Sequence, residues 1–207
     1  KGVKEITLIG QNVNSYGLKV PGEKNFAQLL YAVADVSGVE RIRYTTSHPR
    51  DMGEDVFQAY RDLPQLTSQL HLPVQSGSSR VLRRMKRFYT REKYLWVVDQ
   101  LLSARPDMVF STDFIIGFPG ETDEDFQQTL SLLQEVGFHS SFSFKYSPRP
   151  GTPALKLMER GAVSPEVASA RLTELQTLQR KISVEVNKKT IGQTFDVLVE
   201  GASPREP

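Results

Sequence analysis

One repeated pattern constrains the fold more than any other feature of this sequence. A short strand-like run is followed by a polar loop and then by residues with apolar positions at helical spacing. The strand-like runs are Glu5–Ile9, Glu40–Tyr44, Gln69–Val74, Val109–Ile116 and Ser141–Tyr146. Strands that alternate with helices predict an α/β protein with a parallel sheet and right-handed crossovers.

The polar residues of this pattern follow the carboxyl ends of the strands, as at Gln11-Asn12 and Gln75-Ser76. An open doubly wound sheet and a (β/α) barrel both fit the alternation. Barrel enzymes assemble their sites at the carboxyl ends of the strands, so this placement favours a barrel. Five units are too few for a closed eight-unit barrel. We therefore expect a partial, TIM-like (β/α) barrel that lacks its first unit.

The rest of the chain predicts two further regions after a barrel at residues 1–163. Residues 164–192 form a linker region whose long helix, Pro165–Lys189, carries a narrow apolar stripe. Residues 193–207 are expected to begin a small β module with a strand at Thr194–Glu200. The chain starts without Met, and strand-like runs lie near both of its ends. We therefore expect it to be part of a longer protein.

Composition excludes several classes of function. The 26 Lys and Arg residues nearly balance the 24 Asp and Glu residues, so any nucleic-acid surface must be local. No apolar run approaches the roughly 20 residues that span a membrane. The sequence has no cysteine, which excludes disulfides and thiolate-ligated clusters within this chain. No metal-ligand set or catalytic residue is apparent, and we expect a soluble, cytoplasmic monomer.

Six segments, taken in order along the chain, resemble the radical S-adenosylmethionine (radical SAM) methylthiotransferases. They are Leu8–Gly17, Thr46–Pro49, Leu72–Ser78, Met85–Thr90, Asp113–Thr122 and Tyr146–Thr152. The loops at Gln11–Asn14 and Gln75–Ser78 are most similar to those of the enzymes that act on isopentenyladenosine in tRNA. Related enzymes that act on threonylcarbamoyl-adenosine or on a ribosomal-protein aspartate remain an alternative, as does a non-catalytic RNA-binding scaffold.

The resemblance implies a cofactor set and partners. In such enzymes one 4Fe-4S cluster cleaves SAM, a second supplies sulfur, and a methylthio group is added to carbon 2 of N6-isopentenyladenosine. The three-cysteine loop is absent here, so this chain should ligate neither cluster and be inactive alone. The resemblance also implies tRNA as substrate, and a flavodoxin or ferredoxin as electron donor. The run at Thr194–Glu200 resembles the start of the tRNA-binding TRAM module.

The resemblance also implies residues that bind SAM. Gln11 and Asn12 would meet its amino group, although a simple turn is the alternative. Gln75 and Ser76 suit ribose or carboxylate contacts. Arg87 would pair with the carboxylate, which arginine binds better than lysine. The remaining expected cofactor contacts are Ser47, His48, Ile116, Gly117 and Tyr146.

Several of these assignments have structural alternatives. His48 either contacts the ligand or fixes its loop, Ile116 is either an adenine contact or a core residue, and Asn14 reads as a turn residue. The basic residues between Arg80 and Lys93 form either a solvated helical face or a contact for tRNA phosphates. We expect the substrate tRNA to meet Arg83, Arg84, Tyr146 and Arg149. His71 and His139 are expected to be structural.

Overall fold

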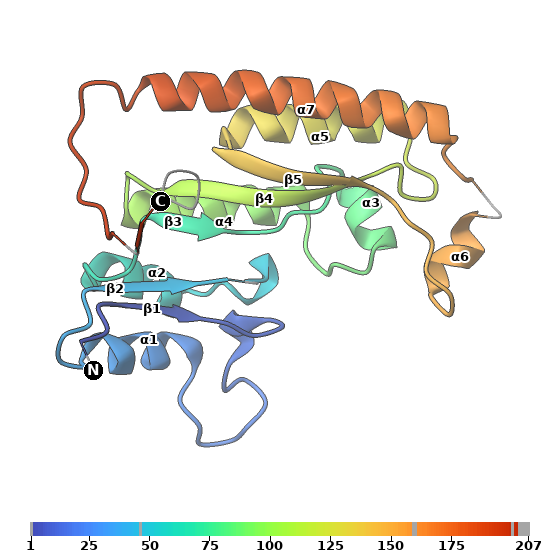
Figure 1. Ribbon diagram of the computed structural model, residues 1–207. Helices are drawn as coiled ribbons and strands as arrows, with labels where there is room; N and C mark the ends of the chain where they lie inside the picture. Colours follow the sequence, from blue (N-terminus) through green and yellow to red (C-terminus); the bar gives the residue numbers. More distant parts are fainter. Residues whose placement is uncertain (1, 46, 159–160, 200, 203–207) are drawn as a thin grey trace.

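The structure is a computed structural model that describes residues 2–45, 47–158, 161–199 and 201–202. Strands and helices alternate along the chain, as the sequence predicts (Figure 1). The strands are β1 (Glu5–Leu8), β2 (Arg41–Tyr44), β3 (Gln69–His71), β4 (Val109–Ile116) and β5 (Ser140–Lys145). The helices are α1 (Phe26–Ala34), α2 (Glu54–Asp62), α3 (Ser79–Arg84), α4 (Arg91–Ala104), α5 (Asp123–Val136), α6 (Pro153–Met158) and α7 (Pro165–Lys188). Short 3-10 turns, η1 (Val13–Ser15) and η2 (Pro49–Asp51), follow β1 and β2.

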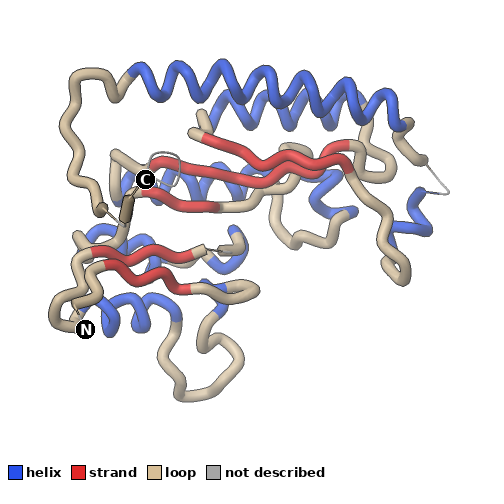
Figure 2. The backbone as a smooth tube through the Cα atoms, viewed as in Figure 1, coloured by secondary structure: helices blue, strands red, loops and turns tan. Residues whose placement is uncertain are grey.

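All observed strand pairs are parallel, and their spatial order follows the sequence. β1 pairs with β2 in one sheet, and β3, β4 and β5 form a second. A single parallel bridge between Ile42 and Leu66 connects the two sheets. A doubly wound sheet reverses its strand order at a switch point, whereas a barrel wall does not. The order therefore confirms the partial barrel (Figure 2).

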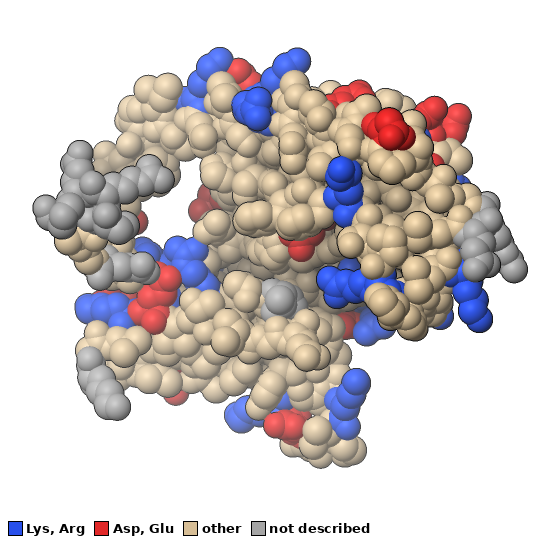
Figure 3. Space-filling model, turned by 45° about the vertical axis from the view of Figure 1, so that its right-hand side comes forward, with Lys and Arg blue, Asp and Glu red and all other residues tan. Residues whose placement is uncertain are grey.

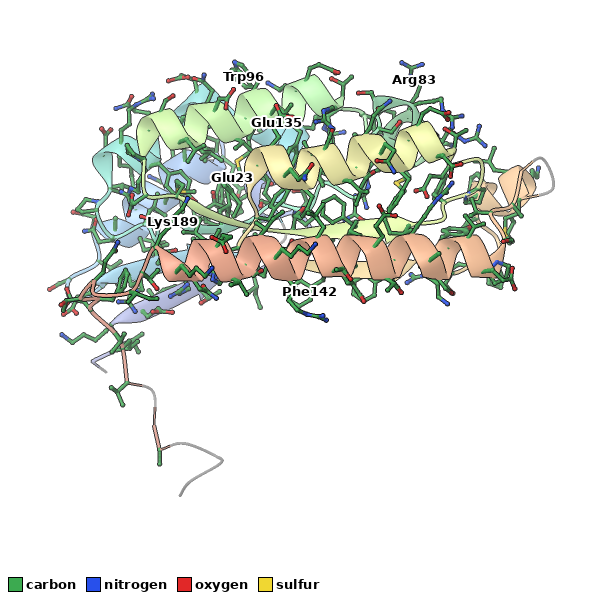
Figure 4. The ribbon with its side chains drawn as sticks, turned by 90° about the horizontal axis from the view of Figure 1, so that it is seen from above. Glu23, Arg83, Trp96, Glu135, Phe142 and Lys189 are labelled. Atoms are coloured by element: carbon green, nitrogen blue, oxygen red, sulfur yellow. The ribbon has the colours of Figure 1, made fainter. Side chains whose placement is uncertain are left out.

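The hydrophobic core lies between the strands and the helices that cover their outer face. Ile42, Phe57, Tyr94 and Leu133 are fully buried there. Helix α7 lies beside α5 and packs on β5, with Leu175 of its predicted apolar stripe fully buried (Figure 4). The predicted helix is therefore part of the covering layer of the barrel.

Local signals in the sequence account for where α5 begins and ends. The Thr122 side chain accepts a hydrogen bond from the Asp125 amide, and the Asp125 carboxylate accepts one from the Thr122 amide at 2.8 Å. This reciprocal pair is a capping box, which satisfies amide groups that have no partner within the helix. The helix ends at Gly137, whose φ of +66° favours glycine.

The strand expected at Thr194–Glu200 is not formed in its described part, residues 194–199. A strand requires a neighbour with which to exchange backbone hydrogen bonds. No described segment pairs with these residues, so their strand-forming composition has no effect on local structure. Instead, Phe195–Leu198 border a cavity together with Arg41 and Arg43. Within the described part of the chain, no helix combines the length and apolar character needed to cross a membrane.

Candidate functional site

The loops at the carboxyl ends of the strands gather at one end of the barrel, where η1, η2, α3 and α6 lie (Figure 1). This end carries nearly all of the residues that the sequence marks as candidates. Figure 3 brings it forward and shows Lys and Arg side chains around it.

Asp51 joins the loops that follow β1 and β2. One carboxylate oxygen accepts hydrogen bonds from Asn12 Nδ2 at 2.9 Å and from Ser15 Oγ at 2.6 Å, and the other accepts from Arg50 Nε at 2.8 Å. Burial raises the pKa of Asp51, but the hydrogen bonds from Arg50, Ser15 and Asn12 outweigh it and lower the pKa to about 2. Asp51 was not among the residues predicted from the sequence, because a lone acidic residue after Pro49 carries no recognisable pattern.

The backbone of His48 is held by Asn14. Asn14 Nδ2 donates to the His48 carbonyl oxygen at 2.9 Å, and its Oδ1 accepts from the His48 amide at 2.8 Å. Asn14 is 2% exposed, so these bonds are shielded from water. Asn14 is therefore a clamp between two loops rather than a simple turn residue.

Ser47 and the His48 side chain, in the same loop after β2, also make specific contacts. Ser47 is buried, and its hydroxyl donates to the His71 carbonyl oxygen at 2.7 Å. His48 Nδ1 accepts from the Arg50 amide at 3.2 Å, and the His48 ring meets Tyr89 edge to face at 5.2 Å. Burial lowers the pKa of His48, with the charges of Arg87 and Arg50 acting in the same direction against Asp51. The lowered pKa favours the neutral imidazole.

Two adjoining pockets, of about 530 and 570 Å³, lie between these loops and α6. They form one cleft, because Arg87, Ile115, Thr152 and Ala154 line both of them. The side nearer α3 is lined by His48, Arg83 and Arg84. The side nearer β5 is lined by Gln75, Asp113, Tyr146 and Arg149.

Two groups in this cleft lack partners in the described part of the protein. The Arg87 guanidinium makes no hydrogen bond or ion pair with a described residue, although the Arg87 backbone amide donates to the Leu82 carbonyl oxygen. The Tyr146 hydroxyl is buried without a hydrogen-bond partner. A buried polar group without a partner is costly unless a ligand or water satisfies it. Both residues line the same side of the cleft, and a guanidinium without a partner there suits an anionic, hydrogen-bonding ligand.

Asp113 adds a carboxylate to the same cleft. It lies on the inward face of β4, where His71 Nε2 is 3.5 Å from its Oδ1. His71 Nδ1 also lies 3.0 Å from the Ser111 hydroxyl, in accord with the structural role expected for this histidine. Asp113 was not among the predicted contacts. Its place two residues before Ile115 on an eight-residue strand is the signal that could have identified it, because alternate residues face the same side.

Three of the expected contacts face away from the cleft. Ile116 is fully buried in the core, so the strand alternation presents Ile115 to the cleft instead. Gly117 packs on α7, where a Cβ at this position would lie 2.9 Å from Ala168 Cβ. Ser76 is buried, and its hydroxyl accepts from the Ser78 amide at 3.2 Å. Gln11 and Asn12 lie outside the lining of both pockets.

The arginines that follow β3 fall into two groups. Arg80 pairs with Asp125, Arg84 Nε donates to the Pro119 carbonyl oxygen at 3.1 Å, and Arg91 pairs with Glu135 at 2.6 Å. These three tie α3 and α4 to α5 and the loop before it. Arg83, and Arg149 after β5, make no side-chain hydrogen bond or ion pair with any described residue and remain available at the rim of the cleft.

The cleft fits one implied cofactor and not the other. SAM offers a carboxylate and hydroxyls, which suit Arg87, Gln75, Asp113 and Tyr146. An iron–sulfur cluster needs thiolates, and the sequence has no cysteine. No group of three or more acidic or histidine residues able to hold a metal occurs among the described residues either. The described residues therefore provide no ligands for the cluster.

Curated relatives match nearly the whole chain. The sequence is 52% identical over 205 residues to the tRNA-2-methylthio-N(6)-dimethylallyladenosine synthases of Pelobacter propionicus and Geobacter sulfurreducens. It is 49% identical to the enzyme of that name from Roseobacter denitrificans. These alignments cover 97–99% of this chain but 45–46% of each relative. The chain thus spans about half the length of the curated relatives it matches.

The fold and a family profile agree with this similarity. Coproporphyrinogen III oxidase from Escherichia coli, described as a radical SAM enzyme, is similar in structure with a TM-score of 0.58. The match covers 78% of this chain and 38% of that one at 20% identity, so it supports the fold alone. The sequence profile of the radical SAM superfamily matches residues 1–133. On these grounds the chain belongs to the radical SAM superfamily.

Proposed function

We propose that this chain is the SAM-binding barrel core of a tRNA methylthiotransferase, which adds a methylthio group to carbon 2 of N6-isopentenyladenosine. Identity near 50% over almost the whole chain to synthases named for this reaction supports the substrate. The observation that carries the proposal is the cleft, where the Arg87 guanidinium and the buried Tyr146 hydroxyl lack partners among the described residues.

The residues of the cleft divide among the parts of SAM. Arg87 binds the carboxylate, because a guanidinium presents two parallel donors to a carboxylate. Gln75 and Asp113 accept from the ribose hydroxyls, and Tyr146 donates its free hydroxyl proton. Ile115, rather than Ile116, packs on the adenine. When bound, SAM supplies the radical and the methyl group of the reaction.

The surrounding loops keep the cleft in shape and shield it. Asn14 and Asp51 hold the loops after β1 and β2 together, so His48, which lines the cleft from the second loop, needs no rearrangement when the ligand enters. Gln11 and Asn12 are the proposed contacts for the amino group of the ligand, although neither lines the two pockets.

The rim of the cleft binds the tRNA. Arg83, Arg84 and Arg149 supply positive charge at the opening, and Tyr146 lines the same side of the cleft as Arg149. Phosphate contacts of this kind give an affinity that falls steeply with salt. The whole protein acts as a cytoplasmic monomer that takes electrons from a flavodoxin or ferredoxin. Its two 4Fe-4S clusters are ligated outside this chain, so the chain alone is inactive.

Mass spectrometry of tRNA nucleosides tests this proposal. The full protein is reconstituted anaerobically and incubated with SAM, a reductant and tRNA that carries N6-isopentenyladenosine. We expect 2-methylthio-N6-isopentenyladenosine to appear. Product on threonylcarbamoyl-adenosine or on a ribosomal protein would contradict the substrate but retain the reaction class. A protein that assembles no cluster and modifies none of these would be a scaffold instead.

A further inference from the structure

The loop between α3 and α4 presents a phenylalanine to solvent beside the cleft. Phe88 is 73% exposed, whereas Tyr89, the next residue, is 6% exposed. Single exposed apolar residues are common on protein surfaces and need no function. Phe88 differs because both ends of its loop are anchored and its neighbours are unpaired cations.

The anchor before Phe88 is the carboxyl end of α3. The Lys86 amide donates to the Arg83 carbonyl oxygen and the Arg87 amide to that of Leu82, each at 3.0 Å. These two bonds form a Schellman motif, which closes a helix with a residue in the left-handed conformation. Lys86 occupies that position with a φ of +57°, where glycine is the usual residue. The chain direction on entering the loop is therefore set.

The anchor after Phe88 is Tyr89. Its hydroxyl donates to the Val74 carbonyl oxygen at 2.9 Å, and its ring packs against His48. Thr90 then caps α4 by accepting from the Lys93 amide. Between these anchors Phe88 has a φ of +58°, a conformation that is rare and unfavourable for a bulky residue. The loop thus fixes the backbone at Phe88 and leaves its side chain exposed, so binding there needs little ordering of the loop.

The charges near Phe88 also differ from those deeper in the fold. Arg80, Arg84 and Arg91 are all paired with groups of α5 or the loop before it. In contrast, the side chains of Arg83 and Lys86 make no hydrogen bond or ion pair with a described residue. Exposed aromatic rings flanked by free cations are the chemistry that binds single-stranded nucleic acid, because bases stack on the ring while cations meet the phosphates.

We propose that Phe88 is a stacking platform for an unpaired base of the RNA substrate, with Arg83 and Lys86 on the phosphates beside it. Phe88 does not line the cleft, so the stacked base is a neighbour of the base that is modified. This assignment rests on the proposed function, because it requires that the substrate is an RNA. It adds a contact that fixes where the RNA strand crosses the rim.

Binding of fluorescently labelled tRNA to the full protein, measured by anisotropy over a range of salt concentrations, tests this proposal. We expect Phe88→Ala to weaken binding about tenfold at every salt concentration, and Phe88→Tyr to retain affinity because it keeps the ring. Arg83→Gln should instead lower the dependence of log K on log salt by about 0.7 to 0.9. Val36→Ala, which shortens an exposed side chain in a helix-to-strand loop, is the control and should change neither quantity.

Three results would overturn the proposal. If Phe88→Ala binds tRNA with the same affinity as the parent protein, Phe88 is not a stacking platform, and the proposed function is unaffected. An equal loss in Phe88→Ala and Phe88→Tyr would show that the loop shape, not the ring, is responsible. If the parent protein does not bind tRNA at all, both the proposed function and the platform fail.

Discussion

Replacement of Asp51 by Asn tests whether the two loops beside the cleft are held by one carboxylate. Asp51 has a pKa of about 2 in the folded protein, against an ordinary value of 3.8. Each pH unit between these values is worth about 1.36 kcal/mol, which gives about 2.4 kcal/mol at neutral pH. The Asp51 side chain is 9% exposed, but its partner Arg50 is 50% exposed, so we take about 2 kcal/mol as the upper value.

The dependence of this stabilisation on pH follows from the direction of the pKa change. A carboxyl group whose pKa is lowered by folding stabilises the folded state fully above its unfolded pKa. The contribution falls as pH drops from about 4 toward 2, and about half of it remains near pH 3. Asp51→Asn lacks the charge at every pH. The difference in unfolding free energy between the two proteins should therefore be at most about 2 kcal/mol at pH 7 and shrink below pH 4.

Urea denaturation of the parent chain and of Asp51→Asn at pH 7, 4 and 3 measures this difference. Asp99→Asn is the matched control, because Asp99 is exposed on α4 and its side chain makes no hydrogen bond or ion pair with any described residue. We expect the control to change the free energy of unfolding by less than about 0.5 kcal/mol. A difference for Asp51→Asn below about 0.5 kcal/mol at pH 7, or one that does not vary with pH, would refute the reasoning.

Three further changes have defined outcomes. Gly77→Ala would place a Cβ 2.4 Å from the Gln128 carbonyl oxygen of α5, so the thermal midpoint of this variant should fall by an amount equivalent to about 1–3 kcal/mol. In the control variant Gly10→Ala the new Cβ would have no atom nearer than 3.8 Å, so the thermal midpoint should stay unchanged. Arg171→Met leaves the buried Glu121 without its ion pair and should cost about 3–5 kcal/mol in urea denaturation, of which the added Glu121→Gln change restores a large part. Asn14→Ala removes two shielded bonds to the His48 backbone and should cost about 2 kcal/mol, with faster hydrogen exchange at the His48 amide; unchanged exchange would contradict the clamp.

The alternation of strands and helices was predictable because apolar periodicity is a local property of the sequence. The boundaries differed where one residue changed the hydrogen bonding. β3 ends at His71 rather than Val74, since Pro73 has no amide and the Val74 amide donates to the Thr112 hydroxyl at 2.9 Å. The strand expected at Thr194–Glu200 is not formed in its described part for a different reason. Strand formation depends on a partner, which composition does not reveal.

The site was predictable at the level of loops and less so at the level of side chains. The strand-end loops did converge, and Arg87, Gln75, Tyr146 and His48 share one cleft. The direction of a side chain was mispredicted on β4, where a shift of one position decides whether a residue faces the core or the cleft. Ile116 was expected in the cleft, but Ile115 lines it and Ile116 is buried in the core. Asp51 and Asp113 were missed because their roles depend on partners from segments 36 to 42 residues away.

The affinity of the full, anaerobically reconstituted protein for SAM tests the central claim most directly, namely that the cleft beside Arg87 is the cofactor site. Calorimetry would compare the parent protein with Arg87→Gln and with Arg83→Gln, which changes the same charge at the rim of the cleft. We predict that Arg87→Gln weakens SAM binding at least tenfold, while Arg83→Gln leaves it unchanged and weakens tRNA binding. Equal SAM affinity in the parent and Arg87→Gln proteins would contradict the assignment of the cleft.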